Sequence, residues 1–154
     1  DFFTAKELMQ QCIEVCEDNA QKAKYLYQAG LVAFSKGRMD DAREYANKSI
    51  SFNKNYGDAY LLLADLIFRS APTKVGKGQT RDQVYWNLGI YCCAATDKAQ
   101  QAMRMDPGCK SRAQNKINRF YAKNYYPKSE AFFRGAKAGQ RVSVDGYTTT
   151  LRLR

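Results

Sequence analysis

The sequence contains no histidine, the side chain that most often performs general acid–base chemistry near neutral pH. This absence excludes Ser–His and Cys–His nucleophile pairs, and any zinc site that needs an imidazole ligand. The five cysteines form no Cys-x-x-Cys pair, so a thiolate zinc site is not predicted either. We therefore expect a protein that is not an enzyme and holds no metal or cofactor.

Long uncharged segments are also missing. The longest stretch without a charged residue runs from Gln83 to Thr96 and has 14 residues, whereas a transmembrane helix needs about 18 or more. No membrane span is therefore predicted. The chain begins at Asp1 rather than at Met, which is expected either of a shortened chain or of one that has lost a signal peptide.

The cysteines are expected to be buried or nearly buried thiols that serve as small apolar side chains. Cys12 and Cys16 are four residues apart, which places them on one face of a helix, whereas the adjacent Cys92 and Cys93 point in different directions. In an exported protein one long-range disulfide can form, although five cysteines leave at least one thiol free.

Two other patterns that can support chemistry have simpler explanations. The acidic pairs at 17–18 and 40–41 lie at the ends of predicted helices, where capping accounts for them. The segment 76–80 lacks the Gly-x4-Gly-Lys-Ser/Thr spacing of a phosphate-binding loop and follows no buried strand. A flexible basic loop is therefore predicted there.

Apolar residues recur at helical spacing over most of the chain, which predicts a mainly α fold of six to seven helices. The expected helices are 5–18, 22–35, 40–52, 57–69, 80–105 and 106–124, with one or two further turns at 129–134. Thr4 and Thr80 each begin a capping box, and Pro107 suits a first helical turn. The inner face of the first helix is expected to hold Ala5, Leu8, Met9, Cys12 and Cys16.

The last fifteen residues change from helical to alternating periodicity. Asp145-Gly146 is a strong signal for a two-residue hairpin turn. Folding about it pairs Val144 with Tyr147 and Val142 with Thr149, which gathers the apolar residues on one face. The three arginines are expected on the other face, and the β-hairpin, residues 140–154, is expected to lie on the helices.

An internal repeat joins the second and fourth predicted helices. A shift of 34 residues superposes Leu26 on Tyr60, Ala33 on Ile67 and Phe34 on Phe68. Together with the spacing of Gly30, Gly37 and Ala42, this resembles the tetratricopeptide repeat family. The resemblance implies one domain, 1–154, with an N-terminal helix (1–19), a first repeat (20–56), a second repeat (57–107) with an insertion at about 70–88, divergent helices (108–135) and the hairpin. An unrelated helical bundle is the alternative.

The tetratricopeptide resemblance also implies where a partner binds. In such folds the first helix of each pair lines a concave groove, which implies a non-enzymatic scaffold that holds another protein or peptide. The outward positions here are Lys24, Tyr27, Leu31, Asp58, Leu61, Asp65 and Arg69. Tyr27 and Leu31 stand where clamps for a peptide's terminal carboxylate carry Lys and Asn, so that kind of clamp is not expected. The N-terminal helix or the hairpin covering this groove is the alternative.

The positive charge lies in the second half of the chain. Residues 1–68 have 8 Lys or Arg and 10 Asp or Glu, whereas residues 69–154 have 17 and 5. A basic stripe is predicted on the sixth helix, formed by Lys110, Arg112, Lys116, Arg119 and Lys123. The second functional hypothesis is therefore an anion-binding module for nucleic acid or an anionic glycan. A solvated basic face without a ligand is the alternative.

A closer likeness concerns the C-terminal third, where Asp106-Pro107, Asn115–Ile117, Tyr125–Pro127 and Glu130–Gly135 precede a Thr-rich strand. These motifs resemble those of uncharacterised envelope-associated tetratricopeptide proteins of Gram-negative bacteria. The resemblance implies export to the periplasm or cell envelope after removal of a signal peptide. A cytoplasmic location stays open on the residues alone.

Overall fold

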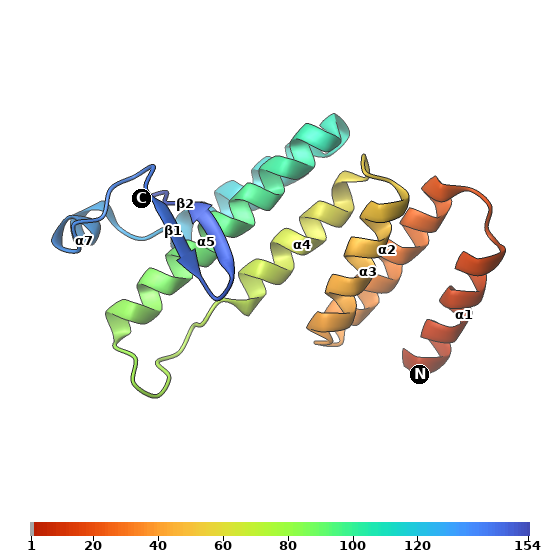
Figure 1. Cartoon of the computed structure of the whole chain (residues 1–154), viewed down its shortest axis with the longest axis horizontal. Coiled ribbons are helices and arrows are strands. Elements are labelled where there is room, and N and C mark those ends of the chain that lie inside the picture. The colour runs from red at the N-terminus through yellow and green to blue at the C-terminus, as the bar shows by residue number, and fades with distance from the viewer. Residues whose placement is uncertain (1) are drawn as a thin grey trace.

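The computed structural model describes residues 2–154, with side chains for residues 7, 8 and 10–154. It is mainly helical and ends in a two-stranded antiparallel hairpin, as predicted. The helices are α1 (Phe2–Val15), α2 (Asn19–Ser35), α3 (Met39–Phe52), α4 (Gly57–Ser70), α5 (Arg81–Met105), α6 (Lys110–Lys116) and α7 (Lys128–Phe133). The strands are β1 (Arg141–Val144) and β2 (Tyr147–Thr150). Helices α1 and α7 lie at opposite ends of an elongated molecule (Figure 1).

Helix α4 lies between two hydrophobic clusters and is buried on both sides. Its residues Leu62, Leu63 and Leu66 pack with α2 and α3, whereas Leu61 and Ile67 pack with α5 and the segment that follows it. Helices α2 and α3 form one antiparallel pair, and α4 and α5 form the next, side by side along the molecule (Figure 1). The 34-residue shift found in the sequence thus relates α2, the first helix of one pair, to α4, the first helix of the next pair.

Small residues allow close contact within the first pair. Gly30 of α2 faces both α3 and Leu62 of α4: an added Cβ would lie 3.4 Å from the Tyr45 Cβ and 2.8 Å from a methyl carbon of Leu62. Ser49, fully buried in α3, donates a hydrogen bond from its Oγ to the backbone oxygen of Ala23, at 2.7 Å. Because that hydroxyl is paired, its burial carries little cost.

Helix α5 begins and ends where the sequence predicts. The Thr80 hydroxyl accepts a hydrogen bond from the Gln83 amide, and the Gln83 side chain accepts one from the Thr80 amide, which completes the capping box. The predicted loop spans residues 71–80, between α4 and α5. After α5, a 3-10 turn (Pro107–Cys109) leads into α6, and a π-helical turn (Ile117–Tyr121) and a 3-10 turn (Ala122–Asn124) complete this helical segment.

The hairpin has the predicted register, with Val144 opposite Tyr147 and Val142 opposite Thr149. Val142 and Leu151 pack on Ile90 of α5. The expectation that all three arginines point away from the helices is wrong for Arg152. The chain leaves the strand after Thr150, and Arg152 turns toward α5, where it pairs with Asp97 at 2.7 Å.

The predicted details of α1 are mostly wrong. The helix begins at Phe2, so Thr4 lies inside its first turn and is not an N-cap. Leu8 is 57% exposed and Cys12 is exposed, whereas Ile13 is buried. The reason is that α1 packs mainly on α2, and this one-sided contact reaches the face that carries Ile13. The side chains of Ala5 and Met9, also predicted on the inner face, lie outside the described residues.

Replacement of Gly89 tests how closely α5 packs on the C-terminal segment. A Cβ at Gly89 would lie 2.9 Å from the backbone nitrogen of Tyr126 and 3.0 Å from its Cβ. We expect Gly89→Ala to lower the free energy of unfolding by about 1–3 kcal/mol through overpacking. This loss should appear although alanine is intrinsically favoured over glycine in a helix by about 1 kcal/mol.

Urea unfolding followed by circular dichroism measures the difference. The control is Gly76→Ala in the loop, where the added Cβ meets only the flexible end of the Gln79 side chain. That change should stay within about 0.5 kcal/mol. Equal stabilities for the two variants would contradict the close approach of Tyr126 to α5.

Candidate functional site

A hollow of about 420 Å³ opens between α2, α4 and α6. Five of the seven predicted groove residues line it, together with two residues of the predicted basic stripe. These residues are Tyr27, Leu31, Asp58, Leu61, Asp65, Arg112 and Lys116, joined by Leu62. None of the described side chains of α1 or of the hairpin lines it, and the segment that borders the hollow is α6.

The predicted groove residues differ in how accessible they are. Leu31 is 40% exposed and Tyr27 is half-buried, whereas Leu61 is only 4% exposed and belongs to the core around α5. The expectation that Leu61 points outward to a partner is therefore wrong. Lys24 and Arg69 are exposed and do not line the hollow. Leu61 is buried because the chain after α5 folds back against this face of α4.

Two ion pairs and a hydrogen bond fix α6 and the turn after it to the edge of the hollow. Arg112 donates to Asp58 through Nε at 3.2 Å and through a terminal nitrogen at 2.8 Å. Lys116 lies 2.7 Å from one oxygen of Asp65, and the hydroxyl of Tyr121 donates to the other at 2.9 Å. Each carboxylate of the groove thus has a cation of its own.

The predicted basic stripe is divided between two environments. Arg112 and Lys116 are neutralised by the carboxylates of α4. Lys110, Arg119 and Lys123 are exposed and belong to none of the ion pairs found among the described side chains. The stripe therefore presents three unpaired cations to solvent rather than five.

Tyr27 sits beside the carboxylates of the hollow. Its ring packs edge-on against Tyr56, with centroids 5.4 Å apart. Burial, and next the negative charge of Asp58, raise the pKa of Tyr27 to about 12, because both disfavour a phenolate. The phenol is therefore neutral at physiological pH and offers a hydroxyl and an aromatic edge to a ligand.

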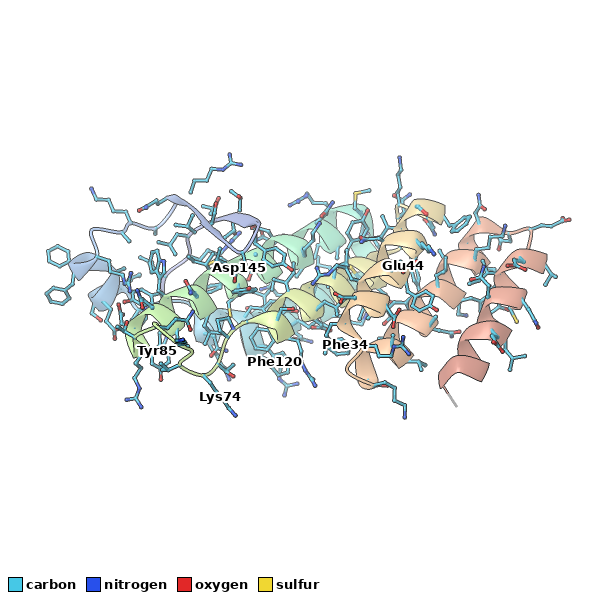
Figure 2. The ribbon with its side chains drawn as sticks, turned by 60° about the horizontal axis from the view of Figure 1, so that its bottom comes forward. Phe34, Glu44, Lys74, Tyr85, Phe120 and Asp145 are labelled. Carbon is cyan, nitrogen blue, oxygen red and sulfur yellow. The ribbon has the colours of Figure 1, made fainter. Side chains whose placement is uncertain are left out.

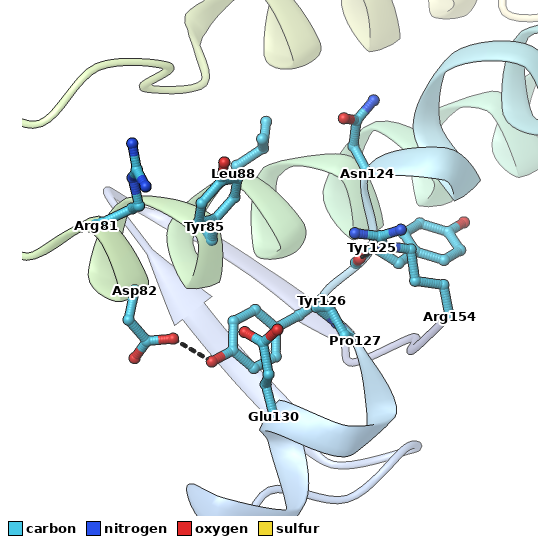
Figure 3. A pocket seen from close by; sticks show the side chains of 10 residues that line it. All are labelled: Arg81, Asp82, Tyr85, Leu88, Asn124, Tyr125, Tyr126, Pro127, Glu130 and Arg154. Carbon is cyan, nitrogen blue, oxygen red and sulfur yellow. Dashed lines mark hydrogen bonds between the residues drawn. The ribbon is translucent and has the colours of Figure 1, made fainter.

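A second hollow of about 450 Å³ lies between the start of α5 and the segment that leads into α7 (Figure 3). Figure 3 shows the rings of Tyr85 and Tyr126 at its wall and the hydrogen bond from the Tyr126 hydroxyl to Asp82. Two cations, Arg81 and Arg154, also line this hollow. The Nε of Arg154 donates to the backbone oxygen of Tyr125 at 2.8 Å, which holds its side chain against the wall.

Sequence reasoning missed the second hollow. Trp86 packs edge-on against Tyr126, with ring centroids 5.1 Å apart. Tyr85, by contrast, is 53% exposed. The signal that could have identified it is the run Arg81–Tyr85, in which a cation and an aromatic residue lie four positions apart on one helical face.

The cysteines lie in two environments. Cys92, Cys93 and Cys109 are fully buried, as predicted, and burial raises the pKa of the Cys92 thiol to about 12. Cys12 is exposed and Cys16 is half-buried, so the prediction that these two are buried together is wrong. All five are free thiols in this structure, and no disulfide joins them.

Neither a metal centre nor a membrane span emerges from the part of the chain that is described. No group of three or more metal-ligating side chains comes together there. None of its helices combines the length and the apolar composition needed to cross a bilayer.

Comparison with known proteins leaves the family open. No family model and no solved structure matches the chain. A stretch of 44 residues, 29% of the chain, is 41% identical to the uncharacterised protein MJ0572 of Methanocaldococcus jannaschii. That stretch covers 51% of the archaeal protein, so the chain spans about half the length of the curated relative it matches. Because the relative is itself uncharacterised, the likeness assigns no function, and the tetratricopeptide resemblance stays a prediction.

The contacts of Asp65 should matter for stability as well as for the hollow. Asp65→Ala removes the ion pair with Lys116 and leaves the buried hydroxyl of Tyr121 without its acceptor. We expect a loss of about 1–3 kcal/mol in the free energy of unfolding, the usual cost of an unsatisfied buried donor. Urea unfolding measures it.

The matched control is Glu44→Ala, which removes an ion pair whose two side chains are 53% and 60% exposed. That change should cost less than about 0.5 kcal/mol. In a double-mutant cycle, Tyr121→Phe should recover part of the loss caused by Asp65→Ala. Strict additivity of the two substitutions would show that this hydrogen bond is absent in solution.

Tyr27 should make stability depend on alkaline pH. Its pKa is raised to about 12 in the fold, whereas an unfolded tyrosine titrates near its ordinary value of about 10. Between these values the unfolded chain loses a proton that the folded chain keeps, so stability is full below pH 10 and falls as the pH rises toward 12.

We expect Tyr27→Phe to lose less of its stability than the wild type between pH 9 and pH 11. The measurement is the urea midpoint at both pH values. Phe120→Leu, which changes an exposed ring that carries no hydroxyl, serves as the control and should keep the wild-type slope. An unchanged slope in Tyr27→Phe would contradict the neutral phenol beside Asp58.

Proposed function

We propose that this protein is a non-enzymatic interaction scaffold of the tetratricopeptide type, which holds a segment of another protein in the hollow between α2, α4 and α6. The observation that carries the proposal is that equivalent faces of two successive helix pairs converge on one hollow. Tyr27 and Leu31 of α2 and Asp58 and Asp65 of α4 all line it. A ligand bound there contacts both repeats at once, which is how a short groove gains affinity.

The chemistry of the hollow indicates what it holds. Leu31 and the ring of Tyr27 form an accessible apolar wall, and an apolar or aromatic side chain is the usual anchor for such a wall. The opposite wall carries two carboxylates and two cations that already balance each other. Such a wall favours a ligand of low net charge whose backbone or polar side chains exchange hydrogen bonds with the rim.

The alternative, an anion-binding module, has less support. Two of the five cations in the basic stripe are held by Asp58 and Asp65, so only Lys110, Arg119 and Lys123 face solvent unpaired. Three phosphate contacts give a much weaker dependence on salt than five would. We place the scaffold in the envelope of a Gram-negative cell because of the resemblance in the C-terminal third, and this location is part of the same proposal.

Leu31→Asp is the variant that tests the hollow. Leu61, which the sequence suggested, is unsuitable because it is buried and its replacement would damage the core. A peptide selected from a random display library against the wild-type protein provides a ligand of measurable affinity. We expect Leu31→Asp to weaken its binding about tenfold or more, since a carboxylate replaces the apolar wall. Isothermal titration calorimetry measures the dissociation constant.

Val75→Asp is the matched control, because Val75 is also an exposed aliphatic residue, 56% exposed, but lies in the loop before α5. It should bind the selected peptide as the wild type does. A photo-crosslinking residue in place of Leu31 should label the same peptide. If selection yields only peptides that bind Leu31→Asp as tightly as the wild type, the hollow is not the binding site.

A further inference from the structure

Two phenylalanine rings stand almost fully in solvent at the end of the molecule opposite α1. Phe132 is 80% exposed and Phe133 is 86% exposed, which makes them the most exposed aromatic residues among the described side chains. Their rings pack edge to face with centroids 5.8 Å apart. Both belong to α7, and Figure 2 shows aromatic side chains projecting beyond the ribbon at this end. Single exposed apolar residues are ordinary, but an adjacent pair of this size marks a contact surface.

The fold holds this short helix firmly. Ala131, on the inner side of α7, is fully buried. Arg134, which follows the helix, forms an ion pair with Asp82 of α5 and donates to the Tyr126 hydroxyl at 3.1 Å. Its guanidinium also lies over the ring of Trp86, 5.0 Å from the centroid. One face of α7 is therefore anchored on α5 while the other presents Phe132 and Phe133.

Positive charge predominates in the chain segment that carries the two rings. Residues 128–141 contain four cations, Lys128, Arg134, Lys137 and Arg141, and one acidic residue, Glu130. Arg134 is neutralised by Asp82, but the other three cations are exposed and belong to none of the ion pairs among the described side chains. We refer to Phe132, Phe133, Lys128, Lys137 and Arg141 as the α7 tip.

We propose that the α7 tip docks on the surface of an anionic lipid bilayer, with Phe132 and Phe133 inserted among the headgroups. Aromatic side chains flanked by Lys and Arg are the usual composition of a peripheral membrane contact, in which apolar insertion and attraction to anionic lipid act together. The rings project beyond the ribbon at this end of the molecule (Figure 2), although Phe133 also borders a hollow beside Asp82 and Arg134. A fluid bilayer accepts such a shape without a complementary pocket.

A second copy of the chain fits the tip less well. Contact between two tips would bring Lys128, Lys137 and Arg141 of each copy close to the same residues of the other. The whole chain carries a net charge of +10, which adds to this repulsion. An anionic surface instead attracts every one of these groups. The docking surface is separate from the hollow between α2, α4 and α6, so each of the two proposals can be tested without the other.

Flotation with vesicles tests the proposal. The full chain is mixed with vesicles of phosphatidylcholine that contain about one third phosphatidylglycerol, or with phosphatidylcholine alone, at low salt. We expect the wild type to float with the anionic vesicles and much less with the neutral ones. The variant with Phe132→Ser and Phe133→Ser should bind the anionic vesicles about tenfold more weakly, because insertion is lost.

Matched controls separate the tip from the rest of the surface. Val15→Ser removes an aliphatic side chain that is 82% exposed in α1, at the other end, and should leave vesicle binding unchanged. Lys128→Glu with Lys137→Glu should weaken binding, whereas Lys36→Glu with Lys54→Glu, also exposed, should weaken it much less. Circular dichroism confirms that each variant is folded.

Three results would overturn the proposal. The first is that the wild-type chain floats with neither kind of vesicle, which would indicate a protein partner for the α7 tip. The second is binding that survives the two serine substitutions undiminished. The third is a dimer in sedimentation velocity that the serine substitutions dissociate, which would assign the tip to a second copy of the chain.

Discussion

The burial of α4 on both sides is the constraint on which the rest of the structure depends. Nine of its fourteen residues are buried, and seven of these belong to two clusters, one on each side of the helix. Leu62 and Leu66 face the first helix pair, while Leu61 and Ile67 face α5. A helix that is apolar nearly all round has to be covered on all sides, so the chain after α5 must return to it.

The return of the chain to α4 explains why the residues that line the hollow also stabilise the fold. Two polar residues of α4, Asp58 and Asp65, lie where α6 and the turn after it approach. Arg112 and Lys116 neutralise these carboxylates, and Tyr121 completes the hydrogen bonding of Asp65. The rim of the groove is therefore built from the contacts that hold the C-terminal third in place, and its shape is fixed before any ligand binds.

The sequence correctly predicted those features of the fold that depend on residues close together in the chain. The capping box at Thr80 and the hairpin register about Asp145-Gly146 depend on residues within a few positions, and both are confirmed. Contacts between residues far apart in the sequence could not be predicted from such local signals. Leu61 has the spacing of an outward residue in its own helix, but its packing with α5 and the segment after α5 leaves it only 4% exposed. Arg152 follows the strand alternation until Asp97, 55 residues earlier, draws it to α5.

The first half of α5 supports the C-terminal segments of the fold. Gly89 lets the backbone of Tyr126 approach, Ile90 receives the hairpin, and Asp82 holds Arg134 beside α7. The other end of α5 leads to Asp106, which accepts a hydrogen bond from the first amide of α4. One continuous helix of 25 residues, about 37 Å long at 1.5 Å per residue, thus connects the end that carries α7 to the end that carries the hollow. The scaffold function that we propose requires contacts kept at a fixed separation, and this helix is the part of the fold best suited to that task.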